Sequence, residues 1–155
     1  MTSVMACAPA SSAAADAVEV MTTLNAEASA AALEAGAHAM TDVTGFGLLG
    51  HLHGLGRESA LAAEVVAADV PFIDGVDELL ADGAAVSGGS RRNGEYAAPF
   101  TTFADGVPAW RRRLVCDATT SGGLLVAVAP ERAALVPGPV VGRLVEAEPG
   151  AIAVV

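Results

Sequence analysis

The 155-residue chain contains no lysine, and its eight basic side chains, all arginine, stand against eighteen acidic ones. The net charge of −10 argues against a general nucleic-acid-binding protein, because such a protein needs a basic surface to displace counterions from phosphates. The absence of lysine also restricts any phosphate chemistry of this chain to arginine side chains, backbone amides or a metal ion.

Cysteine is scarce as well. Cys7 and Cys116 are the only two, and they lie far apart with no metal-ligand spacing. We therefore expect no disulfide framework and no metal site built on these two cysteines. Cys116 follows Leu114 and Val115 in what reads as a buried strand, so it is predicted to pack as a small hydrophobic side chain.

Long apolar runs are missing too, because none approaches the ~18–20 residues that span a bilayer. The first residues lack the basic segment and sustained apolar segment of a secretory signal, so we expect a cytoplasmic protein without membrane contact. The content of 53% hydrophobic and 17% charged residues is typical of a folded domain with a real core.

The spacing of apolar residues predicts helices that alternate with strands. We expect two long helices, a short helix ending at Gly83 and a brief one starting at Pro130. Residues 1–12 are predicted to form a frayed N-terminus, and residues 84–108 a long irregular loop that is functional or mobile. The pattern predicts an α+β domain over residues 13–155, with a mixed β-sheet flanked by helices. The predicted long helices cover residues 13–35 and 45–58, and the predicted strands cover residues 37–41, 61–67, 113–116, 124–129, 140–145 and 151–155.

The most informative motif is M-T-D-V-T-G-F-G-L-L-G-H-L. A strand that ends here places the Asp42 carboxylate at its tip, and Thr44 suits the N-cap of the following helix. Gly45 and Gly47 leave the first helical amides uncovered, and such amides bind anions. A carboxylate beside them can hold a magnesium ion together with phosphate oxygens. Alternatively, the glycines only permit close helix packing and Asp42 only caps the helix.

The histidines are weaker candidates. His51 and His53 are two positions apart, so they do not share a helix face and a two-histidine metal site is not expected. His51 either acts directly or is a helix-face histidine satisfied by a neighbour. His38, in a predicted strand, has less claim to a role.

Two further motifs contain polar residues in turns. C-D-A-T-T-S-G-G-L-L, from Cys116 to Leu125, can present amides and hydroxyls to an anion, or its hydroxyls can satisfy the backbone of the turn itself. G-G-S-R-R-N, from Gly88 to Asn93, suits phosphate or carboxylate, although loop arginines are mostly solvated. Residues 111–113, all arginine, are interpreted as a solvated charge run without a role.

Taken in order, these three motifs resemble the C-terminal half of selenophosphate synthetase, also called selenide, water dikinase. The helix containing M-T-T-L-N and the ending V-G-R-L-V-E-A-E-P-G-A-I-A-V are similar to that family as well, so the resemblance covers nearly all of residues 16–155. The first motif alone marks the wider superfamily, which includes aminoimidazole ribonucleotide synthetase, formylglycinamidine ribonucleotide synthetase and a hydrogenase maturation factor. The histidine after G-F-G-L-L-G and the two later motifs narrow the resemblance to the selenium enzyme.

The resemblance implies an enzyme that makes selenophosphate from ATP, selenide and water, releasing AMP and phosphate, for selenocysteine and selenouridine synthesis. It implies a two-domain homodimer in which ATP and magnesium ions lie where the halves meet. Asp42 matches the motif aspartate of the magnesium cluster. Thr44, Gly45 and Gly47 match the segment at the phosphate end, and Asn93 matches a loop near the cleft. Asp117 and Ser121 match motif positions interpreted as structural.

The chain also departs from the family pattern. The N-terminal domain with the Gly-rich ATP loop, the reactive cysteine or selenocysteine, the lysine and further magnesium-binding aspartates has no counterpart. Cys7 lacks the family's glycine–lysine surroundings, so no catalytic residue is assigned. We expect a chain that is inactive alone, either a truncated product or one half of a split enzyme. The alternatives are a domain from purine biosynthesis or hydrogenase maturation, and a non-catalytic dimerisation or binding module.

Overall fold

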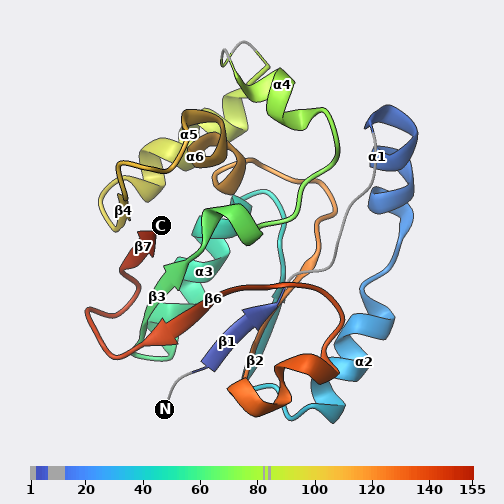
Figure 1. Cartoon of the computed structure of the whole chain (residues 1–155), viewed down its shortest axis with the longest axis vertical. Coiled ribbons are helices and arrows are strands. Elements are labelled where there is room, and N and C mark those ends of the chain that lie inside the picture. The colour runs from blue at the N-terminus through green and yellow to red at the C-terminus, as the bar shows by residue number, and fades with distance from the viewer. Residues whose placement is uncertain (1–2, 7–12, 82, 84) are drawn as a thin grey trace.

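A seven-stranded sheet forms the centre of the computed structural model, which describes residues 3–6, 13–81, 83 and 85–155 (Figure 1). The strand order is β2-β5-β1-β6-β3-β7-β4. Neighbouring strands are antiparallel from β2 to β3, and β3, β7 and β4 run parallel. The predicted mixed sheet is thus confirmed. The strands are β1 (Ser3–Ala6), β2 (Ala39–Asp42), β3 (Ala62–Val65), β4 (Thr101–Phe103), β5 (Leu124–Val128), β6 (Val140–Val145) and β7 (Ile152–Val154).

Helices cover both faces of this sheet (Figure 1). Helices α3, α5 and α6 contribute to one hydrophobic cluster, and α2 packs against another. None of the helices in the described ranges is long and apolar enough to cross a membrane. The helices are α1 (Ala13–Thr22), α2 (Ala26–Glu34), α3 (Gly47–Glu58), α4 (Val76–Ala81), α5 (Gly88–Ala97) and α6 (Ala109–Val115), with 3-10 helices η1 (Ala67–Asp69) and η2 (Pro130–Leu135).

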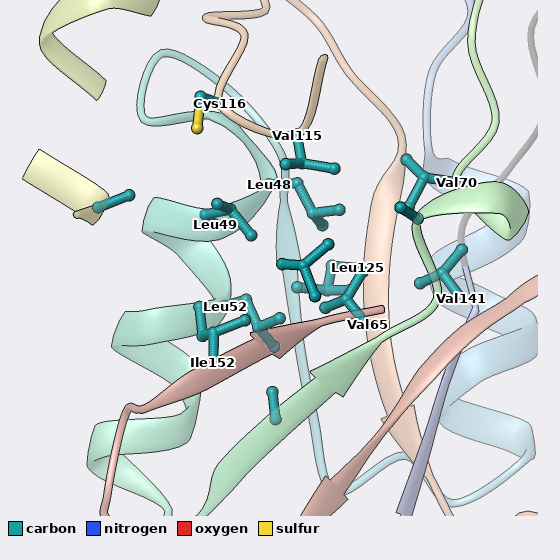
Figure 2. Close-up of a cluster of buried hydrophobic side chains, with 14 of the residues drawn as sticks. Leu48, Leu49, Leu52, Val65, Val70, Val115, Cys116, Leu125, Val141 and Ile152 are labelled. Carbon is teal, nitrogen blue, oxygen red and sulfur yellow. The ribbon is translucent and has the colours of Figure 1, made fainter. Parts of the chain in front are cut away.

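Strand β5 is buried along its whole length because both of its faces are covered. Leu125 and Ala127 point into the cluster beneath α3, whereas Val126 and Val128 point into the cluster beneath α2. Since side chains alternate between the faces of a strand, an unbroken apolar run is what a doubly covered strand requires. Figure 2 shows Leu125 among side chains of α3 and of strands β3 and β7.

Two predictions for the middle of the chain are wrong. Residues 84–108 do not form an irregular loop, because they contain α5 and β4. Ser87 caps α5 by accepting a hydrogen bond from the amide of Ser90 at 3.1 Å. Residues 113–116 are not a strand, since most of them belong to α6. A three-residue apolar run has no periodicity that separates a strand from a buried helical turn.

The N-terminal region also differs from the prediction. The expected helix over residues 13–35 is divided into α1 and α2. Thr22 and Thr23 bond through their hydroxyls to the carbonyl of Glu19 at the end of α1, and Asn25 precedes α2. The expected frayed N-terminus is wrong for Ser3–Ala6, which form β1 between β5 and β6. Residues 1–2 and 7–12 lie outside the described residues.

Truncation of Leu125 tests the double-sided core. Its side chain is 0% exposed, so we expect Leu125→Ala to lower the free energy of unfolding by about 2–5 kcal/mol, as measured by urea denaturation. Leu135→Ala is the matched control, because Leu135 is 55% exposed and its truncation should change stability by less than about 0.5 kcal/mol. Equal losses in the two variants would contradict this placement of β5.

Candidate functional site

Two of the sequence motifs meet where β2 ends and β5 begins. In this antiparallel pair, Asp42 lies opposite Leu124. Beyond it, the amide of Val43 donates to the carbonyl of Gly123, and the amide of Gly122 donates back to the carbonyl of Val43, both at 3.0 Å. The loop of residues 42–46, called here the Asp42 loop, is thereby joined to the loop of residues 116–123, although about eighty positions separate them in the sequence.

Thr119 adds a second connection between these two loops. Its amide donates to the carbonyl of Thr44, and its hydroxyl lies 3.2 Å from the carbonyls of both Val43 and Thr44. The hydroxyl therefore serves the backbone of the neighbouring loop. For this one hydroxyl, the bond differs from the predicted satisfaction of its own turn, whereas anion binding by the C-D-A-T-T-S-G-G motif stays a prediction.

Asn93 joins α5 to both loops. Its side-chain amide donates to the carbonyl of Gly45 at 2.9 Å and to the carbonyl of Cys116 at 3.1 Å. Because both amide hydrogens are directed at backbone carbonyls, Asn93 fixes the position of Gly45. The G-G-S-R-R-N motif therefore reaches the Asp42 loop through its last residue, which lies on a helix instead of a loop.

Ser90 and Asp117 form a buried contact behind Asn93. The hydroxyl of Ser90, which is only 3% exposed, donates to a carboxylate oxygen of Asp117 and accepts a hydrogen bond from the amide of Ala118 at 3.1 Å. This contact secures the start of the second loop against α5. It supports the structural interpretation of Asp117. Ser121, the other position so interpreted, is half-buried in the same loop.

Asn25 is a site residue that the sequence reasoning missed. Its side-chain amide donates to Oδ1 of Asp42 at 2.8 Å and to the carbonyl of Gly122 at 3.0 Å. Although Asn25 occupies the N-cap position of α2, its side chain makes no capping bond there. The available signal was an asparagine at a break in a helical pattern. That its side chain bonds to Asp42 at the end of β2 could not be seen without the fold.

The start of α3 differs from the prediction. Thr44 is not the N-cap, because the helix begins at Gly47 and Phe46 occupies the capping position without a side-chain bond. The carbonyl of Thr44 accepts a hydrogen bond from the amide of Gly47, and its own amide donates to Nε2 of His51. A tight turn over Gly45 and Phe46 therefore separates Thr44 from the helix.

This turn leaves two amides uncovered. Gly45 and Phe46 are both exposed, and within the described part of the chain their backbone N–H groups have no hydrogen-bond partner. Exposed amides next to a helix start can bind an anion. They follow Asp42 by three and four residues, so a carboxylate and two anion-binding groups lie on one short loop.

Asp42 itself is exposed, and its carboxylate is the metal-binding group that the sequence predicts. Among the residues that the structure describes, no group of three or more His, Cys, Asp or Glu side chains could hold a metal ion. Asp42 can therefore supply one ligand, which suits a magnesium ion that keeps waters or phosphate oxygens as its remaining ligands.

Burial favours the neutral form of two side chains beside the loops, His51 and Cys116. Burial lowers the pKa of His51, and the Asp42 charge opposes this effect in part. Burial also raises the pKa of the Cys116 thiol to about 11, with a further contribution from the Asp117 charge. Cys116 is 7% exposed and packs in the core, as the sequence predicts, although it follows a helix.

The other candidate residues lie outside this constellation. The ring of His53 stacks on Phe100 at 3.7 Å between centroids, and its Nδ1 is 2.9 Å from the carbonyl of Gly150, so His53 fastens α3 to the turn before β7. His38 is exposed at the start of β2.

The interpretation of Arg111–Arg113 as a solvated run is wrong. All three arginines on α6 are half-buried and donate to backbone carbonyls. Arg111, for example, bonds to the carbonyl of Val70 and lies over the ring of Trp110. A guanidinium group covers apolar surface with its stem while its fork satisfies carbonyl groups, so these residues hold α6 in place.

Residues 5–138 match the family described as "AIR synthase related protein, C-terminal domain". The chain is 46% identical over 114 residues to the selenide, water dikinase of Burkholderia pseudomallei (strain K96243), covering 74% of this chain and 32% of that protein. The enzymes of the same name from Enterobacter sp. (strain 638) and Cronobacter sakazakii (strain ATCC BAA-894) are 45% and 48% identical, with the same coverage. The chain thus spans about a third of the length of these relatives.

Gly47 should be intolerant of any side chain. Its φ is +66°, and an added Cβ would lie 2.7 Å from the carbonyl oxygen of Asp117. We expect Gly47→Ala to lower the free energy of unfolding by roughly 1–3 kcal/mol in a urea titration. Gly54→Ala, in the same helix with open space around it, should instead raise stability by roughly 0.5–1 kcal/mol. Equal stability of the Gly47→Ala and Gly54→Ala variants would contradict the close approach of Gly47 to the carbonyl of Asp117.

Cys116 should be a poorly reactive thiol. In a Cys7→Ser background at pH 8, we expect iodoacetamide to alkylate it at least roughly a hundredfold more slowly than a free cysteine peptide, because a pKa of about 11 leaves little thiolate. Mass spectrometry follows the reaction, and unfolding in urea should restore the ordinary rate. Fast alkylation of the folded chain would show that the thiol is accessible and its pKa unperturbed.

Proposed function

The chain belongs to the family of AIR synthase related protein C-terminal domains, and we propose that it acts as the C-terminal part of a selenide, water dikinase. The complete enzyme would convert ATP, selenide and water into selenophosphate, AMP and phosphate. The observation that carries this proposal is the exposed carboxylate of Asp42 on the same short loop as the uncovered amides of Gly45 and Phe46. The names of the relatives support the selenium reaction over the others in the superfamily.

The proposal assigns phosphate binding to the backbone. The amides of Gly45 and Phe46 donate hydrogen bonds to phosphate oxygens, which suits a chain that has no lysine. Thr44 and Gly47 shape this end of the site, since one closes the turn and the other lets the second loop approach. Asn93 holds the carbonyl of Gly45, so that the neighbouring amide faces solvent. In this scheme no residue of the chain acts as a nucleophile.

Asp42 would hold a magnesium ion. Asn25 occupies its Oδ1, and Oδ2 has no hydrogen bond to any described residue, so one oxygen is free for a cation. When bound, Mg²⁺ neutralises charge on the phosphoryl group that is transferred. Because magnesium in nucleotide sites uses one or two carboxylates with phosphates and waters, a single aspartate fits such a site. Any further carboxylates would come from the remainder of the enzyme.

That remainder corresponds to the two thirds of the relatives that this chain does not match. We assign the ATP loop, the reactive cysteine or selenocysteine and the lysine to it, whether it is part of a longer chain or a separate one. Its docking would cover apolar side chains of the α1 region, where Val18 is 56% exposed and Leu24, next to Asn25, is 81% exposed. A homodimer, as the family resemblance implies, would then be the working enzyme, and we place it in the cytoplasm.

Phosphorus NMR tests this function. The chain is incubated anaerobically with ATP, Mg²⁺ and selenide, once alone and once with the N-terminal part of a related selenide, water dikinase. We expect a selenophosphate signal only in the mixture, because positioning and charge stabilisation require both parts. Asp42→Asn should lower the rate at least about a hundredfold by removing the charged magnesium ligand.

Asp105→Asn is the matched control for that substitution. Asp105 is also exposed, but it lies in the turn after β4, so the same change of charge should leave the rate within about twofold. If the chain alone made selenophosphate, the assignment of the ATP loop, the reactive residue and the lysine to the other part would be wrong. Full activity of Asp42→Asn in the mixture would overturn the metal assignment.

A further inference from the structure

His51 contacts the Asp42 loop from the first turns of α3. Its Nε2 lies 3.1 Å from the backbone nitrogen of Thr44 and 3.1 Å from the hydroxyl oxygen of the same residue. The ring is half-buried, and Phe46 meets it edge-on with centroids 5.8 Å apart. One ring nitrogen therefore contacts two polar groups of the residue that begins the turn.

The backbone contact determines the protonation state of the ring. A backbone N–H can only donate, so Nε2 must be the acceptor and the proton of the neutral ring must sit on Nδ1. A proton on Nε2 would face the N–H of Thr44, and the bond would be lost. The hydroxyl of Thr44 then also donates to Nε2. The lone pairs of the hydroxyl oxygen therefore point away from the ring.

The helix that carries His51 is itself anchored in the core. Leu49 and Leu52, on either side of His51 in the sequence, are 0% and 1% exposed in the core cluster. Figure 2 shows both side chains directed at the sheet. The start of α3 has no side-chain cap, and the His51 ring instead links the helix to Thr44, which precedes it.

We propose that His51, as the neutral ring protonated at Nδ1, is a positioning residue that holds Thr44 and thereby the loop bearing Asp42 and the free amides of Gly45 and Phe46. The role of this loop rests on the proposed function, whereas the contact with Thr44 does not. His51 touches neither substrate nor metal in this arrangement, so it acts through the loop. Burial of the ring lowers its pKa and supports the neutral form, against the charge of Asp42 at the end of β2.

The first test is the tautomer of His51 in the full chain. Long-range proton–nitrogen NMR of the imidazole nitrogens at pH 7.5 should show Nδ1 protonated and Nε2 bare, with His38→Ala and His53→Ala used to assign the three rings. A ring protonated at Nε2, or at both nitrogens, would overturn the proposal. This measurement needs neither ATP nor metal.

The second test is hydrogen exchange of the Thr44 amide. We expect roughly tenfold faster exchange in His51→Ala, because this amide loses its one acceptor among the described residues. His51→Gln should exchange within about threefold of the unsubstituted chain, since the glutamine side-chain oxygen can replace Nε2 as acceptor. The buried amide of Leu125 serves as an internal reference for global stability. Unchanged Thr44 exchange in His51→Ala, with the Leu125 reference also unchanged, would contradict the proposal.

The third test uses the phosphorus NMR assay with the N-terminal part. We expect His51→Ala to lower the rate of selenophosphate formation about tenfold and His51→Gln to restore most of it, a rescue that loss of packing alone would not give. If Asp42→Asn abolishes activity while His51→Ala is fully active, His51 has no positioning role. If the unsubstituted mixture is inactive, the proposed function fails, and the tautomer and exchange results still decide whether His51 holds Thr44.

Discussion

The pairing of the end of β2 with the start of β5 is the constraint on which the site depends. It sets Asp42 opposite Leu124 and continues as two backbone bonds between Val43 and residues 122–123. Strand β5 packs between two hydrophobic clusters, so its position is fixed and it holds the end of β2 in place. The core of the protein therefore fixes the two ends of this pairing, and side-chain contacts then place the carboxylate and the amides of the loop.

Side-chain amides complete the placement. Asn25 holds the Asp42 carboxylate from the beginning of α2, and Asn93 holds the carbonyl of Gly45 from α5. A neutral amide can donate two hydrogen bonds without adding charge, whereas a lysine or arginine in these positions would compete with a cation for the carboxylate. His51 in its neutral form also holds the loop without adding charge. On the Asp42 loop the site thus presents the exposed carboxylate of Asp42 next to uncovered backbone N–H groups.

Sequence reasoning succeeded where a single local signal decided the structure. The run L-L-V-A-V fits a strand covered on both faces, and the spacing of Leu49, Leu52 and Leu55 fits α3. It failed where local preferences were weak or were overridden. The glycines at the start of α5 suggested a loop, but the Ser87 cap and burial of Ser90 and Ala97 stabilise a helix there. Arg111 and Arg113 of α6 looked solvated because their carbonyl partners, on Val70 and Ala81, lie 41 and 32 positions away and are invisible in sequence.

The chain's sequence by itself determined the class of fold, the strand β5, the helix α3 and the chemical character of the Asp42 loop, because these depend on periodicity and on neighbouring residues. Only the tertiary structure decided which groups meet there. Asn25, His51, Asn93 and Thr119 reach the loop from other elements through hydrogen bonds of about 3 Å, a range over which the side-chain types alone allow many partners. The long-range pairing of β2 with β5 selects one set of partners, since it fixes the positions of the backbone groups that those side chains bond.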